Sequence, residues 1–511
     1  AALGAKTLAL KGVLLTRLSA LHEAAMIDVL CADKTGTLTE NALAVSTVRP
    51  ARPGCNEDDV LSYAALASSP DGGDPIDSAI RALAAARKSE AAGQFTLQRF
   101  TPFDPAVKMA EAIVNARGRE IRVVKGAPSV VAAIAPLPPA AAADLDSFTR
   151  AGHRTIAVAV GPRDALETIG LIAFSDPPRA DSAGLLTELR SLGVATVMVT
   201  GDAAATAATV AHAIGLEGSV CPPGQIPERV SASDFAVYAG VFPEQKFRLV
   251  KSFQRGGHAV GMCGDGANDA PALRQAQMGI AVSTATDVAK AAAGMVLTEP
   301  GLGGIVTAIK EGRAAFQRIL TYTLTLLINK CVTLVVLGLG LVVTRHAVLT
   351  PLLLALSMLT NDFVTMSRTA DRAAPSPYPN AWRIRNLVLA AIPLALFKLL
   401  YCMLVLAAGW YLAHFTPRQM QTLIFATLVF ANQAVMFVTR ERVRLWRSHP
   451  APIILLASAG DFAVVSTLAA CGVLMSALPL LAVALLLLAT IGFALTIDWG
   501  KSAIFTRIRI D

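Results

Sequence analysis

The feature that most constrains this chain is an abrupt change in hydrophobicity near Leu320. Before it, apolar and polar residues mix as they do in soluble proteins; after it, long apolar runs alternate with short polar loops. Such runs are long enough to cross the hydrocarbon core of a bilayer as helices. The composition agrees, because 54% hydrophobic and 16% charged residues are too apolar for an ordinary soluble enzyme. We expect a soluble part over residues 1–312 and a membrane domain over residues 313–511, with the lipid bilayer as a partner.

Six apolar segments are candidate membrane helices: residues 320–343, 347–366, 387–413, 420–438, 452–475 and 477–497. Basic residues gather in the second loop, the fourth loop and the tail, namely Arg368, Arg372, Arg383, Arg385, Arg440, Arg442, Arg444, Arg447, Lys501, Arg507 and Arg509. Loops on the cytoplasmic side are enriched in Lys and Arg. We therefore expect a multi-pass protein of the cell membrane with cytoplasmic soluble domains. The same clustering explains the formal charge of +8, so we expect no nucleic-acid partner.

Polar clusters follow three of four short apolar runs in the soluble part. The runs cover residues 27–32, 194–199, 259–263 and 278–282, and helical patterns separate them. This alternation predicts an α/β fold with a doubly wound parallel sheet. Asp33, Thr200-Gly201-Asp202 and Gly264-Asp265-Gly266 follow the first three runs. Because ligands bind at the carboxyl ends of the strands in such sheets, we expect one active site there.

A different pattern interrupts this alternation between about Arg49 and Val160. A strand-rich patch, Phe95–Val124, lies between stretches rich in proline and alanine. We interpret it as an α+β domain inserted into the first. The expected organisation is residues 21–48 and 161–312 for the sheet domain and residues 49–160 for the insert.

The segment Asp33-Lys34-Thr35-Gly36-Thr37 places a carboxylate nucleophile at the end of a strand. A carboxylate can attack a terminal phosphate and hold it as an acyl phosphate. Related phosphatases usually carry a second Asp two residues later, as an acid–base group that speeds hydrolysis. Thr35 occupies that place here, so we expect a phosphorylated intermediate that persists.

Other polar residues complete the predicted site. Asp265 and Asp269 supply carboxylates that can hold Mg²⁺ beside Asp33. Thr200 and its neighbours offer donors to phosphoryl oxygens, and Lys246 offers a positive charge.

With these motifs, the chain resembles a P-type ATPase from end to end. The most specific matches are DKTGTLT from Asp33, TGD from Thr200 and GDGAND from Gly264. Finer matches resemble the plasma-membrane proton-exporting subfamily: Asp74-Pro75-Ile76-Asp77, Phe100–Pro105, Val241–Lys246, Gly279–Val282, Ala285–Asp287 and Asn361-Asp362-Phe363. The resemblance implies a haloacid-dehalogenase-like phosphorylation domain, an inserted nucleotide-binding domain and an all-α bundle of six transmembrane helices.

The resemblance also implies chemical roles. ATP would phosphorylate Asp33, and Mg²⁺ would be bound by Asp33, Asp265 and the carbonyl of Thr35. Thr200, Lys246 and Asn268 would hold the phosphate, and Asp269 would support the site. The implied catalytic set is Asp33, Lys34, Thr35, Thr200, Gly201, Asp202, Lys246, Asn268 and Asp269.

In the insert, the resemblance implies that Phe103 stacks on adenine and that Arg154 approaches the nucleotide phosphates. The remaining residues implied to lie near the nucleotide or its domain boundary are Lys108, Lys125, Gly126, Asp176 and Arg179. The sequence departs from the family after Lys108, where Met109 and Ala110 replace the usual Arg and Thr.

The family's actuator domain, with its TGE motif, and its first four membrane helices have no counterpart in these 511 residues. Residues 1–20 resemble the stalk that follows the fourth helix. We expect the missing parts as partners, either upstream in a longer protein or on a separate chain.

Ionisable residues inside membrane segments are costly and usually functional. Asp362, beside Asn361 in the second segment, is the predicted ion carrier, and Lys330 in the first is its predicted partner. Lys398 and Asp461 are also intramembrane residues, functional or placed near an interface where a long side chain can reach water.

The expected function is ATP-driven export of a cation, a proton by preference. Two alternatives stay open: a pump for another cation such as Mg²⁺ or Ca²⁺, and a truncated half-subunit that is phosphorylated but does not transport alone. The absence of Cys-Pro-Cys in any apolar segment argues against heavy metals.

Overall fold

The computed structural model describes residues 2–69, 74–88, 95–116, 118–163, 165–222, 224–371, 373–442 and 444–508. These residues form two compact units. The first comprises Ala1–Leu10, Leu18–Met26 and Thr307–Asp511, and the second comprises Lys11–Arg17 and Ile27–Val306. Of the basic residues expected at the cytoplasmic ends of membrane segments, Arg372 and Arg509 lie outside the described residues.

The second unit contains an eight-stranded sheet in the order β1-β14-β13-β12-β2-β9-β11-β10. Among the described residues, its strands pair in parallel except for β1 with β14. The strand bounds are β1 Val13–Leu15, β2 Val29–Asp33, β9 Ala195–Val199, β10 Val220–Cys221, β11 Val237–Tyr238, β12 Val260–Gly264, β13 Met278–Ala281 and β14 Met295–Leu297. The four apolar runs thus form β2, β9, β12 and β13, which confirms the predicted parallel α/β sheet.

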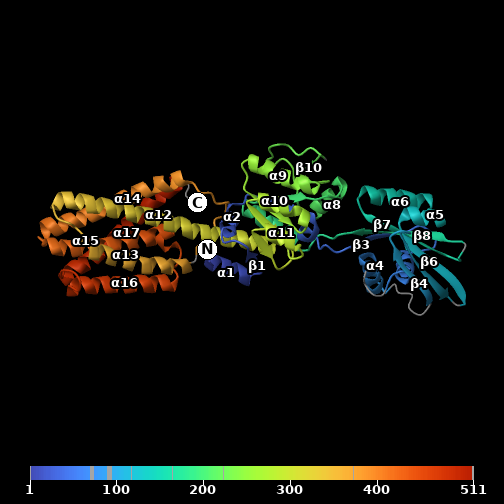
Figure 1. Ribbon diagram of the computed structural model, residues 1–511, viewed down its shortest axis with the longest axis horizontal. Helices are drawn as coiled ribbons and strands as arrows, with labels where there is room; N and C mark the ends of the chain where they lie inside the picture. Colours follow the sequence, from blue (N-terminus) through green and yellow to red (C-terminus); the bar gives the residue numbers. More distant parts are fainter. Residues whose placement is uncertain are drawn as a thin grey trace. The chain divides into compact units, whose positions relative to one another are not determined.

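Helices connect the strands of this sheet (Figure 1). They are α7 Ser182–Ser191, α8 Ala204–Ala213, α9 Pro243–Arg255, α10 Ala270–Gln275 and α11 Asp287–Ala292. All five residues of the central strand β2 are buried, which explains why its sequence is apolar up to the terminal carboxylate.

Between β2 and β9 the chain forms a second, antiparallel sheet in the order β3-β8-β7-β6-β5-β4. Its strands are β3 Ala44–Pro50, β4 Thr96–Asp104, β5 Met109–Ala116, β6 Arg119–Gly126, β7 Arg154–Gly161 and β8 Glu167–Ser175. Its helices are α3 Glu57–Leu66, α4 Pro75–Ala86, α5 Pro128–Ile134 and α6 Pro139–Arg150. The sheet therefore extends beyond the expected range 49–160 at both ends, because β3 and β8 pair with each other.

The alternation of side chains along the strands separates two cores in this part. Val123 packs in a cluster with residues of α3 and α4, whereas Val124 packs with residues of α5 and α6. Because successive strand residues point to opposite faces, the two pairs of helices cover opposite faces of the sheet.

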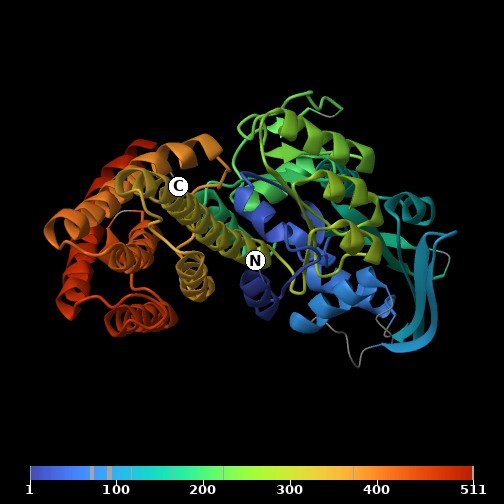
Figure 2. The ribbon, with the colours of Figure 1, turned by 60° about the vertical axis from the view of Figure 1, so that its left-hand side comes forward.

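The first unit is helical, and Figure 2 shows its long helices running side by side in a bundle. Its helices are α1 Ala2–Leu10, α2 Ala20–Met26, α12 Gly303–Thr344, α13 Pro351–Ser367, α14 Ile384–Ala407, α15 Pro417–Arg440, α16 Pro452–Cys471 and α17 Leu480–Ile508; the first residues of α12 belong to the other unit. Helix α15 lies at the centre of the bundle. In its most apolar stretch of 18 residues 94% of the residues are buried, whereas the share is 22–33% in the corresponding stretches of α12, α14, α16 and α17.

Within the described residues, five helices are long and apolar enough to cross a membrane: α12, α14 with its continuation to Leu412, α15, α16 and α17. Helix α13, in the place of the predicted segment 347–366, has only 17 residues. At about 1.5 Å per residue it is some 25 Å long, slightly less than the roughly 30 Å of a hydrocarbon core. Its start at Thr350, which caps the helix, explains the shorter length. The count of six therefore stays a prediction.

Candidate active site and membrane cavity

The nucleophile predicted at Asp33 lies at the carboxyl end of the central strand β2. The next turn bends sharply, with Gly36 at φ +71°, a left-handed conformation that glycine adopts without strain. Thr35, partly buried, lies in this turn. The side chain of Asp33 is itself buried, with 8% of the residue exposed.

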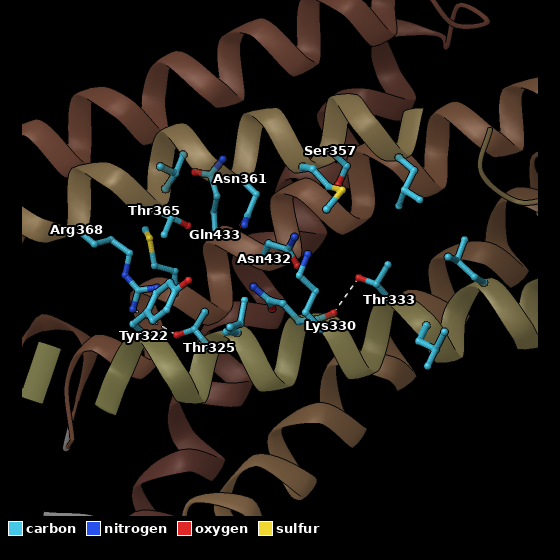
Figure 3. A pocket seen from close by; sticks show the side chains of 18 residues that line it. Tyr322, Thr325, Lys330, Thr333, Ser357, Asn361, Thr365, Arg368, Asn432 and Gln433 are labelled. Carbon is cyan, nitrogen blue, oxygen red and sulfur yellow. Dashed lines mark hydrogen bonds between the residues drawn. The ribbon is translucent and has the colours of Figure 1, made fainter. Parts of the chain in front are cut away.

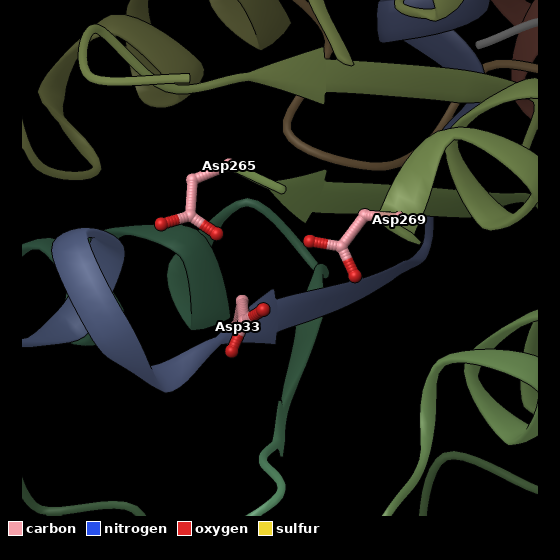
Figure 4. A group of neighbouring side chains, drawn as sticks. All are labelled: Asp33, Asp265 and Asp269. Carbon is pink, nitrogen blue, oxygen red and sulfur yellow. The ribbon is translucent and has the colours of Figure 1, made fainter. Parts of the chain in front are cut away.

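Three carboxylates converge at this strand end (Figure 4). Oxygens of Asp33, Asp265 and Asp269 all lie within 4.8 Å of one another. Strand β12 pairs in parallel with β2, so the residues that follow each strand meet at the same edge. Three neighbouring carboxylates repel one another unless a cation lies between them, and an all-oxygen donor set is one that Mg²⁺ prefers. The residues therefore fit the predicted metal.

Lys246, in the first turns of α9, reaches the same point. Its ammonium donates to Asp33 and, at 2.8 Å, to Oδ1 of Asp269. Burial opposes the charge on Lys246, but the two carboxylates outweigh burial and raise its pKa. Lys246 therefore stays charged beside the nucleophile, as a phosphate-binding group requires.

The third predicted cluster also lies at this edge, since β9 pairs with β2 on the side opposite β12. Lys34 Nζ lies 2.7 Å from Oδ2 of Asp202, and the backbone N–H of Asp202 donates to the hydroxyl of Thr200 at 3.1 Å. Thr200 is buried, whereas Gly201 and Asn268 are exposed. All three clusters thus meet at one site, as their strand ends predicted.

Asp176 and Arg179 lie beside the segment that follows the nucleophile. The hydroxyl of Thr39 donates to Oδ2 of Asp176 at 2.5 Å, and the N–H of Ala42 donates to Oδ1 at 3.2 Å. The N–H of Arg179 donates to the carbonyl of Leu38 at 3.1 Å. These residues join the two chain segments that connect the sheets. The partner Thr39 was missed by sequence reasoning, although it belongs to the same DKTGTLT segment.

In the insert, the structure brings Lys108 and Gly126 together. The N–H of Ala127 donates to the carbonyl of Lys108 at 3.1 Å, and a Cβ on Gly126 would lie only 2.5 Å from that oxygen. Only glycine fits this approach. Phe103 in β4 is 40% exposed, and Arg154 at the start of β7 is exposed, so both side chains are open to a ligand.

Lys125, by contrast, is buried. Its ammonium donates to Asp77 and, at 2.5 Å, to the hydroxyl of Ser68. Burial lowers the pKa of Lys125, and the bond to Asp77 opposes that shift. Sequence reasoning quoted Asp77 only within a motif and missed it as the partner of Lys125. The sequence carries no signal for this pair, because the burial of both residues is visible only in the structure.

In the helical unit, a cavity of about 270 Å³ lies between α12, α13 and α15. Figure 3 shows polar side chains from all three helices around it. Its polar lining consists of Tyr322, Thr325, Asn329, Lys330, Thr333, Ser357, Asn361, Thr365, Arg368, Asn432 and Gln433. Asp362 does not line it and is exposed on α13. The structure therefore places the predicted residues Lys330 and Asn361 at one cavity but does not bring Asp362 to it.

Two other intramembrane residues lie inside the bundle. Lys398 is fully buried, and its ammonium donates to Oδ1 of Asn329 at 2.7 Å and to Oδ1 of Asn432 at 2.5 Å. Asp461 is buried and accepts from the amide of Gln433. Both side chains thus have hydrogen-bond partners inside the bundle. Sequence reasoning left their roles open and missed the three amide partners.

Comparisons with known proteins agree with this architecture. Residues 27–277 match the haloacid dehalogenase-like hydrolase family, and residues 248–309 match a second family with the same description. Over 495 residues, the chain is 34% identical to a protein of Methanocaldococcus jannaschii named "Putative cation-transporting ATPase". The match covers 93% of this chain and 61% of that relative, so the chain spans less than two thirds of its length.

The matched ranges contain seven of the eight strands of the parallel sheet, all except β1, together with Asp33, Lys246 and the acidic cluster. Helix α12 begins within them, and α13 to α17 follow. The printed name of this relative describes cation transport and ATP hydrolysis for that protein. The apolar helices support a multi-pass membrane protein, and residues 27–277 of its soluble part are similar to the haloacid dehalogenase-like hydrolases.

Proposed function

We propose that this chain is the catalytic and membrane part of a P-type ATPase that exports a cation, by preference a proton. The observation that carries the proposal is the convergence of Asp33, Lys246 and two further carboxylates at the carboxyl end of a buried parallel strand. A buried carboxylate with an ammonium beside it is an arrangement suited to attack on a phosphate.

In this mechanism Asp33 Oδ attacks the terminal phosphorus of ATP, the bond to the bridging oxygen breaks, and ADP leaves. Asp33, Asp265 and the Thr35 carbonyl would hold Mg²⁺, which would offset the charge of the phosphate. Lys246 binds a phosphoryl oxygen and remains tied to Asp269. Thr200 and Asn268 supply further donors. Thr35 cannot act as an acid or base for water attack, so the acyl phosphate persists.

The insert would bind ATP, with Phe103 against the adenine and Lys108 and Arg154 near the phosphates. Lys125 would act indirectly, because its ammonium is held by Asp77 and Ser68. We place the soluble parts in the cytoplasm and the helices in the cell membrane, as the clustering of arginine at helix ends suggests. An actuator domain and four more helices would complete the pump. Helix α13 would also cross the membrane, which would make six membrane helices in this chain.

Acid-stable labelling by γ-phosphate-labelled ATP tests the nucleophile. Asp33→Asn should abolish labelling, because an amide cannot attack, while ATP binding should survive. The matched control is Asp146→Asn, a change of the same size at an exposed carboxylate on α6, which should leave labelling intact. Undiminished labelling of Asp33→Asn would place the phosphate elsewhere.

A separate experiment tests whether the transported ion is a proton. Asp362 would be the carrier, because an ionisable side chain within a membrane segment is usually functional. In inverted vesicles that contain the full-length protein, Asp362→Asn should keep phosphorylation and lose acidification. ATPase activity that requires a particular metal ion, without any acidification by the wild type, would favour the alternative pump for Mg²⁺, Ca²⁺ or another cation. Phosphorylation without transport of any ion would favour a half-subunit.

A further inference from the structure

A second and larger cavity, of about 970 Å³, lies in the helical unit between the middle of α12 and the C-terminal ends of α13 and α15. Its lining contains five arginines and two carboxylates, namely Arg318, Arg368, Arg440, Arg442, Arg447, Asp371 and Glu441. The formal charge of the lining is therefore +3, five positive charges less two negative ones. No proposed step of phosphorylation or ion transport uses this cavity.

The two carboxylates are already engaged. Asp371 pairs with Arg440 at 2.8 Å, and Glu441 accepts from the hydroxyl of Ser448. The hydrogen bonds of two other arginines go to neutral oxygens: Arg318 Nε donates to the carbonyl of Asp371 at 3.0 Å, and Arg368 donates to the hydroxyl of Thr325 at 3.4 Å. Positive charge thus remains available to an anionic ligand.

The position of the cavity along the helices indicates the type of anion. Arg368 follows the last residue of α13, Arg440 ends α15, and the apolar part of α12 begins near Leu320. The cavity therefore lies where apolar membrane segments give way to polar chain, the depth at which lipid headgroups lie.

An apolar strip continues from the cavity along α13. Met366, in the cavity lining, is 72% exposed, and Phe363 and Leu359 on the same helix are 68% and 57% exposed. Spacings of three and four residues place these side chains on one face. An acyl chain can bury these apolar side chains, whereas a free phosphate ion makes no apolar contact with them.

We propose that this cavity binds the phosphate of an anionic phospholipid, with an acyl chain of that lipid along Leu359, Phe363 and Met366. Guanidinium groups bind phosphate oxygens in pairs of parallel hydrogen bonds, and Arg318 and Arg368 are the proposed binding residues. The phosphorylation chemistry does not use this site. On the transport side, the exposed Asp362 lies on the same face of α13, three residues from Leu359 and four from Met366, and Arg368 lines both cavities.

Native mass spectrometry of the purified chain tests this site. The chain is released from mixed micelles that contain phosphatidylglycerol and phosphatidylcholine in equal amounts. Wild type should retain phosphatidylglycerol preferentially, and the double variant Arg318→Gln/Arg368→Gln should lower that preference about tenfold, as expected for two lost basic contacts. The matched control is Arg383→Gln/Arg385→Gln, two exposed arginines at the start of α14 that do not line the cavity, and it should behave as wild type.

Two further measurements separate lipid binding from misfolding and from binding of free phosphate. Phe363→Glu alters the exposed strip without changing an arginine and should also lower retention, even if the double arginine variant does not fold. Inorganic phosphate at millimolar concentration should not displace the lipid. Equal retention of both lipids by wild type, unchanged retention in folded variants, or full displacement by inorganic phosphate would overturn the proposal.

Discussion

At the residue scale, the site depends on a few charged side chains that the fold forces together. Lys246 is the clearest case, because it is separated from Asp33 by 213 positions yet donates to it and to Asp269. The sequence predicted the convergence of Asp33, Asp265 and Asp269, since strand ends of one parallel sheet must meet. It could not predict which carboxylate Lys246 contacts, because that depends on how α9 packs against the sheet.

Lys246→Met should lower the rate of Asp33 phosphorylation by roughly 100-fold or more, the scale seen when one charge-stabilising donor is removed. The methionine fills the same space but leaves Asp33 and Asp269 without their shared cation. The matched control is Lys251→Met on the same helix, where the lysine is exposed and lies over the ring of Phe247; it should label at the wild-type rate. Rapid-quench measurement of the labelled protein distinguishes the two.

Asp77→Asn should destabilise the insert, because it leaves the Lys125 ammonium buried without a charged partner. Removing one partner of a buried pair costs about 3–5 kcal/mol. The double variant Asp77→Leu/Lys125→Met removes both charges and should recover most of that loss. Hydrogen exchange of the strands β5 and β6 in the whole chain is the measurement. A double variant as unstable as the single one would show that the pair is not the source of the effect.

At the scale of elements, the sequence predicted whether a segment is a strand or a helix better than it predicted where that element begins and ends. The four apolar runs became β2, β9, β12 and β13 because a buried parallel strand must be apolar throughout. The same property hid β8: residues 167–175 are as apolar as a strand of the parallel sheet, so the pattern could not show that they pair with β3 and β7 instead. Similarly, the apolar run 347–366 concealed the start of α13, which the pair Thr350-Pro351 marks.

The pairing of β8 leads to a prediction about fragments. A fragment of residues 42–177 contains all six strands and should fold alone, whereas residues 49–160 lack β8 and should not. The shorter fragment also lacks five of the seven residues of β3, so the edge of β7 would be exposed and both cores would be opened. NMR spectra of the two fragments provide the comparison, and ATP added to the longer one should shift signals near Phe103. A well-folded 49–160 fragment would contradict the role given to β8.

At the scale of the whole molecule, hydrophobicity predicted a soluble part followed by membrane helices. It could not predict the interior of the bundle, because contacts such as those of Lys398 with Asn329 and Asn432 join three different helices. A local pattern shows that a residue is apolar or polar but not which neighbour it meets.

The chain as it stands should form its phosphoenzyme from ATP but hydrolyse it slowly. Thr35 supplies no acid–base group, and in the resembling family a glutamate of the actuator domain positions water. The decay of labelled protein after a chase with unlabelled ATP measures this step. Rapid steady-state hydrolysis by these 511 residues would contradict it.

The buried ammonium of Lys398 has a consequence for what the smaller cavity can accept. Asn329 and Asn432 line that cavity, but their side-chain oxygens are held by Lys398. A dehydrated metal ion needs oxygens to replace its lost water shell, and it could recruit these two only in competition with a positive charge already bound there. Replacing Lys398 with methionine should release both oxygens and raise the affinity of the chain for rubidium ions, while Lys398→Arg, which keeps the charge, should not. The Lys398 ammonium thus occupies the position that a metal ion would take beside these two oxygens, and a metal ion would have to displace it to bind there.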